Sequence, residues 1–354
     1  MLFRSLDSER PWRCGAFTMA AGTYLVGEST ASTALMMNAR VKVKSISNLM
    51  PRNQGPRRVA LVRGGGFGDL LFLTPIIRAM KKQHPDWEIR VECWKHCQCI
   101  FDGNPHLAEV KDYPPRMDDL MFYTQIHWLE DAMEWEPRSQ NEHVIDLYAK
   151  KMGVELTEGK HLEYYGHLRH FDAMRARFPK KQKRRIGIQL SASAKCRTYP
   201  AALMERLIDL LYRDKEQFEV ALFDIPRKDA QKADKVARVL NLCGEKEPLS
   251  FAESTAVLAD CDAVIAPDSA LCHIAGALDI PTVALYGPFP WQIRTKYAKS
   301  ITAINGHARC APCFHHERES VWPEGGMCRE TGRCEALASI EPERIVKKIK
   351  EMMR

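Results

Sequence analysis

Apolar and polar positions along the chain form two series of short apolar runs followed by helical periods. In the first series, the apolar run at 59–62 predicts a buried strand, and a glycine loop follows it. The apolar period of 69–83 then predicts a helix, and 88–93 predicts a second strand. A strand, a helix and a strand in this order predict a βαβ unit, and therefore a parallel sheet covered by helices.

The second series is longer and follows a basic segment at 167–185 that has the composition of a linker. Its strands and helices alternate, and they are expected at 185–190, 202–213, 218–223, 230–240, 251–261, 262–267, 269–278 and 281–287, before a last helix at 341–353. This alternation predicts a second doubly wound α/β domain. Ligands bind such domains at the carboxyl edge of the strands, so we expect two α/β domains that face each other across a cleft.

The expected organisation has four parts. They are a basic N-terminal extension (1–55), an N-terminal α/β domain (56–178), a C-terminal α/β domain that includes a cysteine cluster (179–339) and a C-terminal helix (340–354). In the extension, short alternating runs around a glycine at 16–28 predict a small hairpin. No apolar stretch is long enough to span a bilayer and no secretory leader is recognisable, so we expect a cytoplasmic protein.

Composition narrows the class of protein, and charge locates one unusual segment. The 354 residues are 45% hydrophobic and contain 20 Gly, 20 Pro and 12 Cys, which excludes fibrous, low-complexity and disulfide-framed classes. The net charge is +7, but residues 1–58 hold nine basic and three acidic residues and so carry most of it. A basic arm can bind nucleic acid, anionic lipid head groups or a phosphorylated substrate, or it can be a solvated extension without a partner.

The glycine loop before the first helix contains Gly65, Gly66 and Gly68 and ends at Asp69. Its free N–H groups and the helix dipole favour an anion. A dinucleotide fingerprint needs glycine where Asp69 stands, and no Lys-Ser/Thr pair follows for a phosphate-binding Walker loop. Asp69 can either cap the helix or act as a general base on a substrate hydroxyl.

Two loops of the second series carry candidate phosphate-binding residues. The turn at 268–273 contains Asp268 and Ser269, which can cap a helix, and leaves backbone N–H groups open to a diphosphate; a pair of capping residues with a core histidine is the alternative. The loop at 189–200 carries Lys195 and Arg197. These cations suit the charge on a leaving diphosphate, or they are simply solvated.

Together these motifs resemble glycosyltransferase family nine, the heptosyltransferases that act on lipopolysaccharide. The resemblance rests on "VALVRGGGFGDLLFLTPIIRAMKKQHPDWEI", on "FDGNPHLAEV" and on "APDSALCHIAGALDIPTVALYGPFP". It implies the GT-B fold, with two Rossmann-like domains facing a cleft. It also implies inverting, metal-independent sugar transfer from a nucleotide diphosphate, ADP-heptose or a related ADP-sugar, to a hydroxyl of a glycan or glycolipid such as a lipopolysaccharide core. No cofactor is needed for that chemistry, and the location is the cytoplasm or the inner face of the membrane.

The resemblance also assigns residues. Asp69 would be the base, and Arg197 stands where the family commonly has lysine. The donor would be held by Asp268, Ser269, Ala270 and His273, with Lys195 close by and Asp229 near the ribose. Ser269-Ala270 replaces the usual Thr-Gly pair, so the identity of the donor sugar stays open.

A cysteine cluster and two other functions complete the expectations. Cys310 and Cys313, with Cys328 and Cys334, have the spacing of a structural zinc site, and unliganded thiols are the alternative. The basic arm and the basic run at 179–185 also fit a nucleic-acid-binding protein or a glycosyltransferase that modifies nucleic acid. A third alternative is an NAD-dependent oxidoreductase, because glycine loops of this kind also bind dinucleotides.

Overall fold

The computed structural model of the chain describes two compact units, formed by residues 1–137 with 145–158 and by residues 138–144 with 159–354. The described residues are 57–116, 119, 122–130, 132, 141–157, 159–180, 182–214, 217–224, 240–241, 249–314 and 334–354, together with the strands between residues 3 and 46. Among the described residues no helix has both the length and the apolar character needed to cross a membrane.

The N-terminal extension contains strands of two small antiparallel sheets. The strands are β1 (Phe3–Ser8), β2 (Trp12–Cys14), β3 (Phe17–Met19), β4 (Gly22–Gly27) and β5 (Lys42–Ile46). β2 pairs with β3, whereas β4 and β5 flank β1. The two strands within 16–28 therefore pair with other strands and not with each other, which differs from the expected hairpin because the longer β1 offers β4 a partner of matching length.

The first unit contains a four-stranded parallel sheet in the order β8-β7-β6-β9. Its strands are β6 (Arg58–Val62), β7 (Glu88–Cys93), β8 (Glu109–Asp112) and β9 (Gln125–Trp128), and its helices are α2 (Phe67–Leu71), α3 (Thr74–Gln83), η1 (Lys95–Phe101) and α5 (Val144–Met152). The parallel pairing of β6 with β7 confirms the predicted βαβ unit. Because β7 and β8 lie on one side of β6 and β9 on the other, the strand order reverses between β6 and β9.

The helix expected at 69–83 is interrupted, and α2 ends before α3 begins. Pro75 has no N–H to donate to the carbonyl of Leu71, and the Thr74 hydroxyl donates to that carbonyl instead at 2.9 Å. The break shortens α2 to the single turn that carries Asp69.

The second unit contains a six-stranded parallel sheet in the order β12-β11-β10-β13-β14-β15. Its strands are β10 (Arg184–Gln189), β11 (Phe218–Phe223), β12 (Leu240–Asn241), β13 (Ala263–Pro267), β14 (Thr282–Tyr286) and β15 (Ile301–Asn305). This is the doubly wound order 3-2-1-4-5-6, which reverses between β10 and β13. The expected α/β architecture is therefore confirmed, and the helix expected at 230–240 lies almost entirely outside the described residues.

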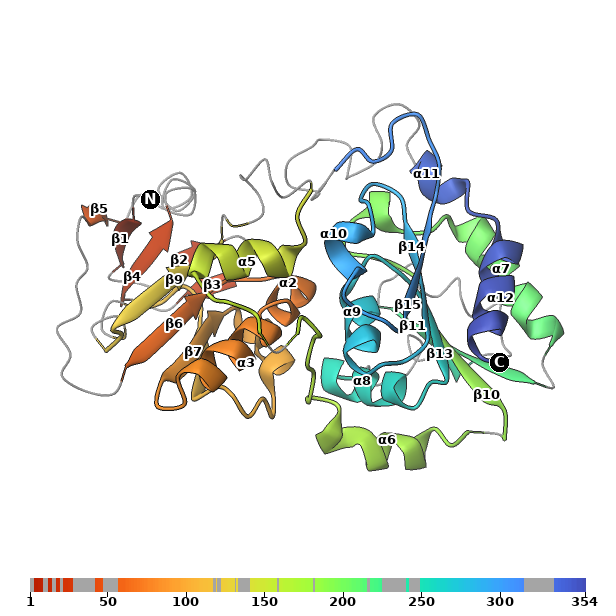
Figure 1. Cartoon of the computed structure of the whole chain (residues 1–354), viewed down its shortest axis with the longest axis horizontal. Helices are drawn as coiled ribbons and strands as arrows, with labels where there is room; N and C mark the ends of the chain where they lie inside the picture. The colour runs from red at the N-terminus through yellow and green to blue at the C-terminus, as the bar shows by residue number, and fades with distance from the viewer. Residues whose placement is uncertain are drawn as a thin grey trace. The chain divides into compact units, whose positions relative to one another are not determined.

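Helices cover both faces of this sheet (Figure 1). α7 (Ala201–Arg213) and α12 (Pro342–Met352) pack on one face through Leu207, Leu211 and Ile345, all fully buried. α8 (Phe251–Ala259) and α9 (Ala270–Ala277) pack on the other. The short helices are η3 (Leu168–His170), α6 (Phe171–Arg177), η4 (Lys195–Arg197), α10 (Gln292–Thr295) and α11 (Glu335–Ala338).

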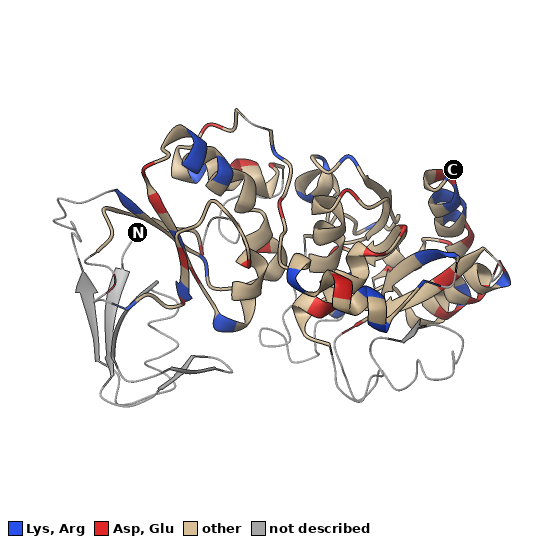
Figure 2. Cartoon of the chain, turned by 90° about the horizontal axis from the view of Figure 1, so that it is seen from below, with Lys and Arg blue, Asp and Glu red and all other residues tan. Residues whose placement is uncertain are grey.

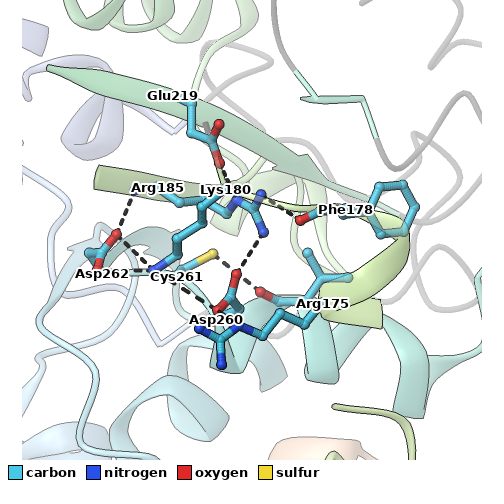
Figure 3. Close-up of polar contacts among 9 residues, drawn as sticks. Arg175, Phe178, Lys180, Arg185, Glu219, Asp260, Cys261 and Asp262 are labelled. Atoms are coloured by element: carbon cyan, nitrogen blue, oxygen red, sulfur yellow. Dashed lines mark hydrogen bonds and ion pairs between the residues drawn. The ribbon is translucent and has the colours of Figure 1, made fainter. Parts of the chain in front are cut away.

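A buried ion network joins α6 to the amino end of the second sheet (Figure 3). The guanidinium of Arg185, 2% exposed, donates to Glu219 at 2.6 Å, to Asp260 at 3.0 Å and to the Phe178 carbonyl at 2.7 Å. Residues 159–178 belong to the second unit, whereas the sequence placed them in the first domain. A basic, polar segment does not show by its composition that its backbone is held by a buried arginine.

Positions of Lys and Arg alternate with positions of Asp and Glu along the described ribbon of both units (Figure 2).

Candidate functional site

Two polar clusters lie where the strand order reverses, one in each unit. In the first unit the loop after β6 and the residues after β9 form one cluster. In the second unit the residues that follow β10 and β13 form the other. The carboxyl ends of strands at such a reversal are where open α/β sheets bind ligands, because the connections diverge there and leave a crevice.

The glycine loop of the first unit leads directly into α2. Gly66 is the N-cap residue and has a φ of 87°, which glycine adopts without strain. A Cβ on Gly66 would also lie 2.2 Å from Oδ2 of Asp69, and a Cβ on Gly65 would lie 2.9 Å from the Trp94 ring. Gly68 lies within α2 and is half-buried. Two of the predicted loop glycines are therefore required by the space around Asp69 and Trp94.

Asp69 is the third residue of α2 and does not cap it, because Gly66 occupies the cap position. Its carboxylate, 23% exposed, accepts a hydrogen bond from Arg63 at 3.0 Å. Arg63 is 2% exposed and also donates to the Glu130 carbonyl at 2.8 Å. The alternative of a capping Asp69 is thus wrong, and the carboxylate is held in an ion pair at the edge of the sheet.

The second cluster centres on Asp268, which follows β13 and is buried. Its Oδ1 lies 3.4 Å from Nε2 of His273, and its Oδ2 lies 3.6 Å from Arg197 and 4.0 Å from Arg294. Burial by itself raises the pKa of Asp268. The hydrogen bond from His273 and the two guanidinium charges outweigh burial, so this pKa lies well below its usual value and the carboxylate stays ionised.

Arg197 is held on two sides, which directs its guanidinium toward the end of β13. It donates to the backbone carbonyl of Asp268 at 3.2 Å and also to the Ser193 hydroxyl. Its Nε is buried and has no hydrogen-bond partner among the described residues. Lys195, two residues earlier on η4, is exposed and makes no contact with this cluster that the described residues show.

Ser269 occupies the N-cap position of α9 without capping it. Its hydroxyl donates to the side chain of Gln189, at the end of β10, and so bridges the two strands between which the order reverses. The first N–H groups of a helix have no partner within the helix, and here no side chain of the cap residue takes them. Ala270 is the first residue of α9, and His273 follows one turn later.

The structure therefore brings together Arg197, Asp268, Ser269, Ala270 and His273, and it keeps Lys195 apart. Asp229 lies outside the described residues. Sequence reasoning missed Arg63, Glu130, Gln189 and Arg294. An arginine directly after an apolar run was the available signal for Arg63, whereas the other three are brought to the strand ends only by the fold.

The cysteine cluster is described only in part, because Cys328 lies outside the described residues. Cys310 is exposed, and Cys313 and Cys334 are half-buried and close enough to interact electrostatically. Within the described part of the chain no three His, Cys, Asp or Glu side chains are grouped to hold a metal ion. The zinc expectation gains no support from the structure.

Comparisons with known proteins agree on one family. The model of glycosyltransferase family 9 (heptosyltransferase) matches residues 126–321, more than half of the chain. Lipopolysaccharide heptosyltransferase 1 of Pseudomonas aeruginosa is 28% identical over 130 residues, which are 35% of this chain and 36% of that protein. Lipopolysaccharide heptosyltransferase 2 of Escherichia coli K12 is 28% identical over 166 residues, 43% of this chain and 40% of that protein. The matched segments span about two fifths of these relatives.

Two solved structures are similar to this chain over nearly their whole length. ADP-heptose lipopolysaccharide heptosyltransferase II of E. coli has a TM-score of 0.61 at 17% identity and covers 84% of this chain and 98% of its own. The dodecameric iron-containing heptosyltransferase TibC, solved with ADP-D-beta-D-heptose, has a TM-score of 0.60 at 11% identity and covers 100% of this chain and 92% of its own. These likenesses confirm the GT-B fold class. None of these proteins is described as binding nucleic acid or NAD, so neither alternative gains support from them.

Proposed function

Because the chain belongs to glycosyltransferase family 9, the heptosyltransferase family, we propose that it is a glycosyltransferase. It transfers a heptose or a related sugar from a nucleotide diphosphate to a hydroxyl acceptor. The donor binds the second unit and the acceptor binds the first.

The observation that carries this proposal is the cluster of Asp268, Arg197 and Arg294 at the strand reversal of the second unit. Two guanidinium groups and the open N–H groups of α9 suit the negative charge of a diphosphate. The ionised Asp268 suits the hydroxyl donors of a sugar and keeps the two cations in place while the site is empty.

The proposed reaction uses the charges of the two clusters. The acceptor oxygen forms a bond to the anomeric carbon as the bond from that carbon to the diphosphate breaks, and Asp69 takes the acceptor proton. The electron pair leaves with the nucleoside diphosphate, whose growing charge Arg197 and Arg294 stabilise without a metal ion. A single displacement by an oxygen on the opposite face inverts the anomeric configuration.

The donor and the acceptor are proposed from the relatives. The two sequence relatives are lipopolysaccharide heptosyltransferases, and the TibC structure contains an ADP-heptose. We therefore propose an ADP-activated heptose as donor, with Asp229 near its ribose, and a lipopolysaccharide-like glycolipid as acceptor. Such an acceptor would place the enzyme in the cytoplasm at the inner face of the membrane.

The cysteine cluster is proposed to hold one structural metal ion, with Cys310, Cys313, Cys328 and Cys334 as thiolate ligands. Cys334 is the N-cap residue of α11, and burial raises the pKa of its thiol to about 11, so a metal ion would have to displace the thiol proton when it binds. TibC is described as iron-containing, so elemental analysis of the purified protein has to measure iron beside zinc. A protein that contains neither metal contradicts this part of the proposal.

A thermal-shift and transfer experiment tests the function. ADP and ADP-heptose are expected to raise the melting temperature of the protein, because a ligand stabilises the state that binds it. UDP-glucose is expected to have less effect, and mass spectrometry of a heptose-deficient lipopolysaccharide is expected to show one added heptose, with EDTA leaving the rate unchanged. If no nucleotide sugar shifts the melting temperature and no sugar is added, the proposal is wrong.

A further inference from the structure

We propose that Arg63 and Glu130 are positioning residues for the reaction, and that Arg63 holds one oxygen of Asp69 so that the other oxygen meets the acceptor hydroxyl. This inference rests on the function proposed above, because it gives Asp69 the role of base.

The backbone of Arg63 is fixed by the sheet. Arg63 directly follows β6, and its N–H donates to the carbonyl of Glu92 on β7 at 3.0 Å. The residue therefore continues the strand pairing by one position. Its side chain leaves a rigid backbone at the point where the strand order reverses, 2% exposed to solvent.

The guanidinium of Arg63 then joins the ends of two strands. Its NH1 donates to the Glu130 carbonyl at 2.8 Å and to the Glu130 carboxylate at 3.3 Å, whereas its NH2 donates to Oδ2 of Asp69 at 3.0 Å. The other carboxylate oxygen of Glu130 accepts the N–H of Gly64. Glu130 thus fixes both the arginine and the start of the glycine loop.

The charges explain why the arginine stays in place. Burial lowers the pKa of a guanidinium, but the negative charges of Asp69 and Glu130 and the nearby Tyr148 outweigh burial and raise the pKa of Arg63 above its usual value. A permanently charged, planar group between two carboxylates keeps a fixed geometry, because its N–H groups point in fixed directions. Without that cation, the two carboxylates would repel each other.

The two oxygens of Asp69 are then unequal. Oδ2 is held by Arg63 and lies over Gly66, where a Cβ would be only 2.2 Å away. Oδ1 has no hydrogen bond or ion pair among the described residues, and the side chain is 23% exposed. A general base needs a free lone pair in a defined direction, and this arrangement leaves one.

Kinetics of Arg63 variants test the inference. Arg63→Gln is expected to lower kcat about 100-fold with an unchanged KM for the sugar nucleotide, since misplacing a reacting group by about 1 Å has an effect of this size. Arg63→Lys restores the charge without the planar geometry and is expected to lose only about tenfold. Arg58→Gln is the matched control. Arg58 lies on β6, the strand that Arg63 follows, and the substitution removes a partly exposed ion pair with Glu88 of β7. The kcat of this variant is expected to stay at the wild-type value.

A double-mutant cycle separates positioning from a merely structural role. If Arg63 acts through Asp69, the variant with both Arg63→Gln and Asp69→Asn is no slower than Asp69→Asn alone. Losses that multiply overturn the inference, and so does a folded Arg63→Gln protein with a lower melting temperature but wild-type kcat. Arg63→Lys keeps the cation that the carboxylates require, so the comparison remains decisive if Arg63→Gln does not fold. Absence of transfer by the wild-type protein is a separate result, which overturns the proposed function itself.

Discussion

Arg197 contacts Asp268 twice, once through the carboxylate at 3.6 Å and once through the backbone carbonyl at 3.2 Å. The arginine is thereby tied to the end of β13 as well as to its own loop. For the donor proposed above, a cation held in this way is in place before the diphosphate binds, which is the condition for electrostatic stabilisation without reorganisation.

Replacement of Arg197 tests that role. Arg197→Ala is expected to lower the transfer rate by about 10²-fold or more, because one preorganised donor to a developing charge has an effect of this order. Arg197→Lys keeps the charge and should retain more activity than Arg197→Ala. Arg169→Ala, an exposed arginine of the same unit, is the control in the same steady-state assay. Equal rates for wild type and Arg197→Ala would exclude the role.

Asp268→Asn probes the carboxylate that separates the two arginines. Removing one partner of a buried ion pair leaves uncompensated charge, so the variant should lose about 3–5 kcal/mol of the free energy of unfolding. ADP is expected to raise its melting temperature more than that of the wild type, since the diphosphate replaces the lost negative charge. Differential scanning calorimetry with and without ADP measures both effects. A variant that melts at the wild-type temperature would contradict the first effect, and a rise with ADP no larger than that of the wild type would contradict the second.

Gly66→Ala tests the space beside Asp69. The positive φ costs alanine about 1–3 kcal/mol, and the new Cβ must also displace the Asp69 carboxylate. We expect a drop in kcat of about 100-fold, as for a displaced catalytic group. Gly153→Ala is a close control, because Gly153 also has a positive φ, 67°, but nothing lies within 4 Å of its Cβ. It should lose stability and keep its kcat; an equal loss of kcat in both variants would exclude the specific effect.

Glu92 is expected to make stability depend on pH. It is buried on β7, accepts a hydrogen bond from Tyr123 at 2.5 Å, and its other oxygen has no hydrogen-bond partner among the described residues. Burial raises its pKa to about 7, so its folded-state pKa exceeds the unfolded one. The unfolded state then binds fewer protons between about pH 4.5 and pH 7, and the free energy of unfolding falls as pH rises through this window by about 3 kcal/mol.

Glu92→Gln removes the titrating group and retains an acceptor for Tyr123. Chemical unfolding at pH 5 and pH 8 should show a smaller pH dependence in this variant than in the wild type. Glu88→Gln, a partly exposed carboxylate of the same strand, should leave the wild-type pH dependence in place. The same pH dependence in all three proteins would refute the assignment to Glu92.

Asp260→Asn separates stability from donor binding. The Asp260 carboxylate pairs with the buried Arg185 at the amino end of the sheet, opposite the edge that carries Asp268. We expect a loss of about 3–5 kcal/mol in urea unfolding with an unchanged KM for the sugar nucleotide. Asp209→Asn, exposed on α7, should change neither. A raised KM in Asp260→Asn at a temperature where it is folded would show that the two edges are coupled.

Strands that carry a continuous apolar run were predictable, and those that pair at a sheet edge were not. The strand at 59–62 and the strands between 185 and 287 are buried on both faces. Strands of this kind consist almost entirely of apolar residues, so the sequence alone indicates where they lie. β8 (Glu109–Asp112) and β9 (Gln125–Trp128) are polar and partly exposed, and they are strands because a neighbour offers them backbone partners. The pairing partners of β4 were unpredictable for the same reason.

The sequence by itself determined the two α/β units, the family, and the residue types placed after the strands, because local periodicity and short motifs carry that information. The tertiary structure decided which side chains meet. Arg63 reaches Glu130 across 67 positions, and Arg197 reaches Asp268 across 71, because the parallel sheets reverse their order between the strands that precede these residues. Contacts of this range depend on the strand order, which no local pattern of residues specifies.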